Sequence, residues 1–112
     1  LGLHDDETAK LWRAFIPYSH YDGIATWPYL ASDRDSALTR LKRLAKRPQF
    51  ICHENTNSNL NLAATKQWIE STGINANLTF AETGFRNHND AWLLRDSPIR
   101  VQLRAWLDRS LK

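Results

Sequence analysis

The chain has 112 residues, of which 42% are hydrophobic and 24% are charged, a composition typical of one small folded domain. Its single cysteine, Cys52, excludes an internal disulfide framework and any zinc or iron–sulfur site built from several cysteines. No apolar run approaches the roughly 18–20 residues of a membrane-spanning helix. We therefore expect one domain over residues 1–112, with a helical and aromatic region over 1–46 and a strand–helix–strand–helix region over 47–112.

The formal net charge of +3 is unevenly distributed along the chain. Residues 1–31 hold four acids against two bases, whereas residues 32–48 hold six bases against two acids. Such a basic cluster can hold phosphate or nucleic acid, but it is more often the solvated face of an amphipathic helix. Because no zinc-finger spacing, glycine-rich phosphate loop or aromatic RNA-binding signature accompanies it, we favour the helix and do not expect a nucleic-acid partner.

The first half of the chain predicts two helices separated by an aromatic loop. Three acids at 5–7 precede an apolar-spaced run, which favours a helix N-terminus there and a helix that continues until Pro17 ends it. Residues 16–31 hold two prolines, a glycine and four aromatic rings without a helical period, so they form a loop that either covers a core or lines a pocket. Ser32 is the expected N-cap of the second helix, which Pro48 stops.

Two short strands are predicted in the second half. Residues 49–53 are apolar and flanked by polar residues, which indicates a buried strand. Residues 77–82 alternate between apolar and polar side chains and indicate a second strand. Strands separated by one helix predict a parallel crossover with helices on both faces, and so an α/β fold with short parallel β-strands alternating with helices.

Capping residues mark the helices of this half. Asn59 or Asn61 is expected to cap a helix over 62–72, and Gly73 to follow its end. Ser97 is the expected N-cap of the last helix, because proline follows it at the first helical position.

The second half therefore contains an ordered set of features. They are a proline before a strand (47–53), a polar loop (54–57), a helix that ends at a glycine (64–73), a strand (76–80), a loop with a histidine (84–89) and a last helix (97–111). This order resembles the C-terminal part of α/β-hydrolases, in which the first loop carries the catalytic acid and the second the catalytic histidine. The resemblance implies the end of a larger sheet and hydrolysis of an ester, thioester or amide.

The resemblance assigns His88 as the general base, and the alternative is an ordinary polar loop histidine. A general-base histidine needs a carboxylate to fix its tautomer. The family's acid position falls nearest Asn57, which cannot ionise, and Glu54 at the end of the strand substitutes if the loop is shifted. The aromatic loop would then line the acyl pocket or form a lid. Its candidate substrate-binding residues are Tyr18, Tyr21, Trp27 and Tyr29.

The serine elbow G-x-S-x-G that normally precedes both partners does not occur in the sequence. Ser19 lacks the flanking glycines and has tyrosine beside it, so it is a poor candidate for the nucleophile. Cys52 is expected to be a buried structural thiol. A chain that starts without methionine suggests a processed product or an excised piece. We therefore expect a second chain or segment to carry the nucleophile that attacks a small acyl substrate.

No cofactor, metal or membrane partner is expected. The four histidines show neither H-x-x-x-H nor H-E-x-x-H spacing, so the sequence gives no reason to expect a metal site. Cytoplasm is the default location, and removal of a secretory leader stays open.

A different function also stays open from the sequence alone. A non-catalytic α/β module could bind a protein partner through the aromatic loop and the basic helix, because tryptophan and arginine dominate binding hot spots.

Overall fold

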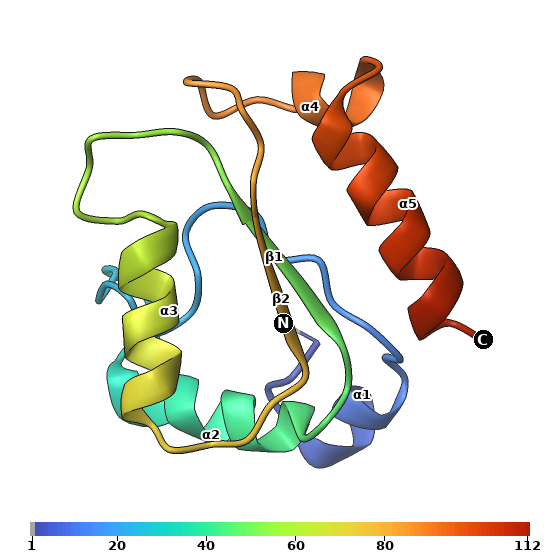
Figure 1. Cartoon of the computed structure of the whole chain (residues 1–112). Helices are drawn as coiled ribbons and strands as arrows, with labels where there is room; N and C mark the ends of the chain where they lie inside the picture. Colours follow the sequence, from blue (N-terminus) through green and yellow to red (C-terminus); the bar gives the residue numbers. More distant parts are fainter. Residues whose placement is uncertain (1) are drawn as a thin grey trace.

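A computed structural model describes residues 2–112 and places them in three layers (Figure 1). Within these residues two parallel strands, β1 (Gln49–His53) and β2 (Leu78–Glu82), form the middle layer. The helices between residues 2 and 112 are α1 (Asp6–Lys10), α2 (Arg34–Leu44), α3 (Leu62–Ser71), α4 (Ala91–Leu94) and α5 (Pro98–Ser110). Helix α5 lies on one side of the strands and α3 on the other (Figure 1). The prediction of a mixed helix-and-strand fold with parallel strands is confirmed.

The sheet is extended on one edge by residues 15–18, which are paired with β1 by two isolated parallel bridges. Phe15 lies opposite Gln49, and Tyr18 lies opposite Cys52. Pro17 has no N–H to donate, so the ladder is interrupted there, although its carbonyl accepts from the Cys52 amide at 3.0 Å. Three parallel segments therefore end on the same side of the molecule.

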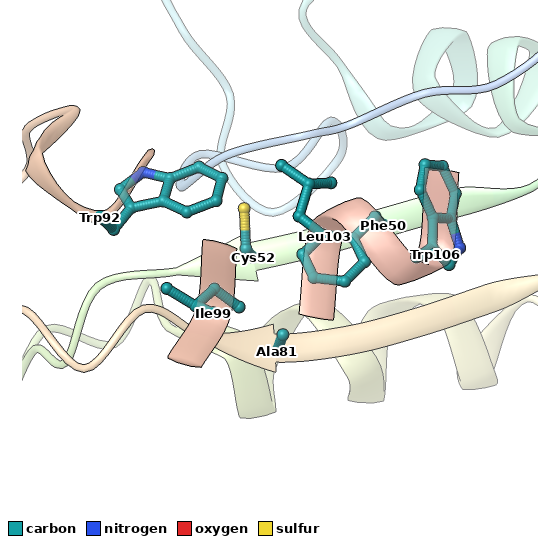
Figure 2. Close-up of a cluster of buried hydrophobic side chains, with 7 residues drawn as sticks. All are labelled: Phe50, Cys52, Ala81, Trp92, Ile99, Leu103 and Trp106. Carbon is teal, nitrogen blue, oxygen red and sulfur yellow. The ribbon is translucent and has the colours of Figure 1, made fainter. Parts of the chain in front are cut away.

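Strand β1 is buried along its whole length because helices cover both of its faces. Its side chains alternate between the two faces, which gives the protein two hydrophobic clusters. The cluster on the α5 side contains Phe50, Cys52, Ala81, Trp92, Ile99, Leu103 and Trp106 (Figure 2). The cluster on the side of α2 and α3 contains Tyr21, Leu41, Leu44, Ile51 and Ile69.

The first helix is shorter than the sequence predicted. Helix α1 ends at Lys10, whereas the apolar pattern continues to Phe15. The backbone of Phe15 instead bonds to β1, donating to the Pro48 carbonyl at 3.0 Å and accepting from the Phe50 amide at 2.9 Å. Tertiary pairing overrides the helical pattern here, and Leu11 is left 79% exposed.

The prediction that Ser32 caps α2 was wrong. The carboxylate of Asp33 accepts from the Ser36 amide at 2.8 Å and is the N-cap. The Ser32 hydroxyl is used elsewhere, accepting from the Trp27 amide at 2.6 Å. The helix also ends earlier than expected, at Leu44.

The elements of the second half agree with their predicted positions. Asn61 caps α3 by accepting from the Ala64 amide at 2.8 Å, and Gly73 adopts a φ of 67° just past the helix end. Ser97 caps α5, with proline at the start of the helix. Helix α4 was not predicted. Between residues 2 and 112, none of the helices combines the length and the apolarity needed to cross a bilayer.

Candidate active site

The loops that follow β1 and β2 bring a carboxylate and a histidine together at one end of the sheet. Glu54 comes directly after β1, and His88 lies in the loop after β2. Glu54 Oε1 is 3.5 Å from His88 Nδ1. The Glu54 side chain is 10% exposed and that of His88 is 55% exposed, so a buried carboxylate stands behind an imidazole that is open to solvent.

The carboxylate of Glu54 is held from several sides. The Ser19 hydroxyl donates to Oε1 at 3.2 Å. His53 Nδ1 donates to the Glu54 backbone carbonyl at 2.9 Å and lies 3.3 Å from Oε2, which accepts no hydrogen bond within residues 2–112. Burial raises the pKa of Glu54, but its own backbone amide, His53, the Ser19 hydroxyl and His88 together bring that pKa below its usual value. Glu54 is therefore ionised at neutral pH.

The imidazole of His88 is positioned by Tyr18. The two rings stack almost in parallel, with centroids 4.8 Å apart and planes 4° apart. The Tyr18 hydroxyl donates to the Asn89 carbonyl at 3.0 Å and accepts from the Asn89 amide at 3.2 Å, which fixes the residue next to His88. Since Nδ1 faces Glu54, Nε2 is left available, and no hydrogen bond or ion pair engages it within residues 2–112.

Ser19 lies close to this pair but faces the carboxylate. Its backbone amide donates to the Cys52 carbonyl at 2.9 Å, and its φ of 65° is left-handed. The side chain is buried, and its hydroxyl bonds to Glu54. Among the described residues no hydrogen bond joins Ser19 to His88. This geometry suits a residue that holds the acid in place.

Two of the four predicted aromatic residues line a common pocket. Tyr18 and Tyr21 contribute, with His20, to a pocket of about 240 Å³ between residues 15–22 and α2. Trp27 and Tyr29 do not line it. Trp27 packs edge-on against His20, with ring centroids 5.4 Å apart, and Tyr29 is 67% exposed. The aromatic loop thus covers the core with some of its rings and lines a pocket with others.

Asn57 was the other residue considered as the partner of His88, and among residues 2–112 no hydrogen bond or ion pair joins the two. It lines a second, polar pocket of about 590 Å³, to which Glu54 and Arg86 also contribute. The ionisable group next to His88 is therefore Glu54, and the amide of Asn57 is in a position to contact a polar ligand in the second pocket.

The remaining candidate groups have structural roles. Cys52 is fully buried in the cluster of Figure 2, and burial raises the pKa of its thiol to about 12, which agrees with the prediction of a structural cysteine. Two of the six bases of the basic cluster form ion pairs with acids from the first 31 residues, Arg40 with Asp22 and Arg43 with Asp6. In the described part of the chain, histidines, cysteine and acids form no group of three that could hold a metal.

The sequence did not predict that His20 lies beside His88, with the ring centroids 5.6 Å apart. The missed signal was the strand-like segment 15–18, which places His20 at the same end of the sheet as Glu54.

Comparison of the chain with protein-family models, curated proteins and solved structures gave no match.

Proposed function

We propose that this chain is a hydrolase-like domain that contributes a general-base histidine, His88, to the hydrolysis of an ester, thioester or amide. Glu54 is the carboxylate partner of His88. The nucleophile comes from another chain or segment, so that the domain is part of a larger enzyme. The observation that carries the proposal is the 3.5 Å separation of Glu54 Oε1 and His88 Nδ1 at the carboxyl ends of neighbouring parallel strands. Sheets of this kind place their ligands at those ends.

The proposed roles of His88 and Glu54 follow from which imidazole nitrogen faces the carboxylate. With Nδ1–H directed to Glu54, the free Nε2 accepts a proton from the hydroxyl or thiol that attacks the acyl carbon. The ionised Glu54 then stabilises the imidazolium, and His88 returns the proton to the leaving group. Tyr18 limits the rotation of the ring by stacking on it.

Three variants of the complete enzyme, which includes the chain or segment that carries the nucleophile, test these roles. Hydrolysis of a p-nitrophenyl ester should fall by roughly 10²–10⁴-fold for His88→Ala. Glu54→Gln should cause a loss of similar size, because an amide does not stabilise the imidazolium. The control is His4→Gln, which should leave hydrolysis unchanged. His4 also pairs with a carboxylate, Asp5 at 2.9 Å, but this pair is exposed on the surface.

Two results would contradict the proposal. One is undiminished turnover by a folded His88→Ala variant. The other is a native mass that shows this chain alone, together with no activity on esters, thioesters or amides. Co-purification of a larger chain that carries an activated serine would support it.

A second candidate function, a non-catalytic binding module, is favoured by exposed apolar side chains. Tyr29 and Leu30 are 67% and 97% exposed near the end of the aromatic loop, and Leu11 and Trp12 are exposed after α1. Aromatic residues of this kind serve as anchors in protein interfaces. Replacing Tyr29 and Leu30 by serine should abolish capture of a specific protein partner while leaving hydrolysis unchanged, and a change in hydrolysis alone would argue against this function.

A further inference from the structure

We propose that the outer edge of β2 pairs with the same edge of a second copy of this chain, in antiparallel orientation, so that the two copies share one continuous sheet. This goes beyond the proposed function, because it concerns the assembly of the chain and would stand if His88 catalysed no reaction.

The outer edge of β2 carries backbone groups that the described chain does not engage. At its two ends β2 bonds to β1 through the Asn77 carbonyl and the Thr83 amide, both at 2.9 Å. A parallel ladder engages every second residue of a strand, so the odd-numbered residues of 77–83 face β1. The even-numbered residues direct their N–H and C=O groups outwards, and these are Leu78, Phe80 and Glu82. Within residues 2–112 no hydrogen bond engages the backbone of these three.

This edge is open to a partner strand. Strand β1 is buried along its whole length, whereas Leu78 and Phe80 are only half-buried and Glu82 is exposed. Helices α3 and α5 lie on the two faces of the sheet, and neither lies across β2 (Figure 1). Edge strands are commonly protected from pairing by lysine, proline or a bulge, and residues 78–82 contain none of these. A row of unpaired backbone groups therefore favours an extended strand as the occupant.

The opposite edge of the sheet is less suited to such pairing. Residues 15–18 join β1 only by two isolated bridges. Ser19 follows them with a left-handed φ of 65°, which ends the extended conformation. Strand β2, in contrast, is continuous over five residues.

The positions of the outward groups define a symmetric register. In an antiparallel pair centred on Phe80, this residue lies opposite its own copy, and Leu78 lies opposite Glu82 of the second copy. Residues that face each other in this way exchange two backbone hydrogen bonds per pair. All the outward groups of β2 are then satisfied, and the same surface serves both copies, as a closed two-fold dimer requires.

Charges at the two ends of β2 favour a second copy in this orientation. Glu82 lies at the carboxyl end of the strand and forms no ion pair within residues 2–112. Lys46 is exposed, lines a small cavity with residues 75–77 at the other end, and has no ion pair in the described chain either. Antiparallel pairing brings Glu82 of each copy to the end that carries Lys46 of the other. Parallel pairing would place the two Glu82 side chains together, and like charges across strands are unfavourable.

The first test follows the full ¹⁵N-labelled chain over a range of concentrations by sedimentation equilibrium and amide hydrogen exchange. We expect a monomer at about 1 µM and mainly a dimer at about 1 mM, as suits a small interface. The amides of Leu78, Phe80 and Glu82 should gain protection as the dimer forms. Those of Thr79 and Ala81 already bond to β1 and should not change. A chain that stays monomeric at about 1 mM, or a dimer that leaves the three outward amides unprotected, would overturn the proposal.

A second test exchanges the charges. Glu82→Lys and Lys46→Glu each place like charges together, and two-fold symmetry repeats the change, so each should weaken dimerisation by about tenfold. The double variant restores opposite charges and should dimerise like the wild type, whereas a double variant as weak as the single ones would refute the antiparallel register. Glu7→Lys is the control, since it makes the same charge change on α1, which precedes the opposite edge, and should leave dimerisation unchanged. His88→Ala should also dimerise like the wild type, so a failure of the proposed hydrolysis stays distinguishable from a failure of the pairing.

Discussion

The backbone of Ser19 makes a pair of substitutions at this position informative. Its φ of 65° is a left-handed conformation that costs a residue other than glycine roughly 1–2 kcal/mol. Its hydroxyl donates to the buried, ionised Glu54, and a hydrogen bond to a charged group contributes roughly 1.5–3 kcal/mol. At 3.2 Å this bond is long, so we take the lower end of that range.

Alanine and glycine lose the same hydroxyl but differ in the backbone. Ser19→Ala keeps the strained conformation and should lower the free energy of unfolding by about 1.5 kcal/mol. Ser19→Gly relieves roughly 1 kcal/mol of strain and should lower it by only about 0.5 kcal/mol. The smaller of these changes comes from glycine, which is unusual because glycine normally destabilises a folded protein more than alanine does.

Urea denaturation, followed by the fluorescence of the buried Trp92 and Trp106, measures this difference. With a slope of about 1–3 kcal/mol per molar urea, the two midpoints should differ by roughly 0.3–1 M. An alanine variant as stable as the glycine variant would refute the left-handed conformation. Two variants as stable as the wild type would refute the hydrogen bond to Glu54.

Three further predictions concern the acid, the thiol and a helix cap. Glu54→Gln should flatten the pH dependence of stability in the acid range. The lowered pKa of Glu54 gives stability that is present above its unfolded pKa of about 4.3 and is lost as the pH falls through the folded pKa. Stability curves of variant and wild type that run parallel from roughly pH 3 to 7 would contradict this. Cys52 should react with a thiol reagent only after unfolding, because it is buried and its pKa is about 12, and rapid labelling of the native protein would disprove its burial. Asn61→Ala should lower the free energy of unfolding, measured by urea denaturation, by about 1 kcal/mol, because it removes the cap of α3. The control Asn59→Ala should change it by less than about 0.5 kcal/mol. Equal losses would show that the cap is not specific to Asn61.

Where local chemistry decides the structure, the sequence was sufficient. The apolar run of β1 and the N-cap Ser97 were predicted at their observed positions, and Asn61 is one of the two residues expected to cap α3. Each signal lies within a few residues of the structure that it specifies, because a buried strand needs a short apolar run and a cap bonds three residues ahead.

Where contacts between residues far apart in the chain decide the structure, predictions from neighbouring residues were wrong or left alternatives open. Residues 15–18 are extended only because β1 provides their hydrogen bonds. Ser32 and Asp33 are both good caps, and the amide of Trp27 takes the serine out of that role. The sequence left Glu54 and Asn57 open as partners of His88, and the path of the loop after β1 puts Glu54 next to the imidazole.

The parallel arrangement of the three extended segments also affects how the protein folds. Ser19 and Glu54 are 35 residues apart in the chain, and Tyr18 and Asn89 are 71 residues apart. Closing such loops costs chain entropy before the contacts stabilise the structure. Folding should therefore be slow for a chain of this length. The Glu54–His88 pair joins two of these segments and cannot form from either alone. Its formation therefore reports that the sheet has been assembled, which makes the site a late product of folding.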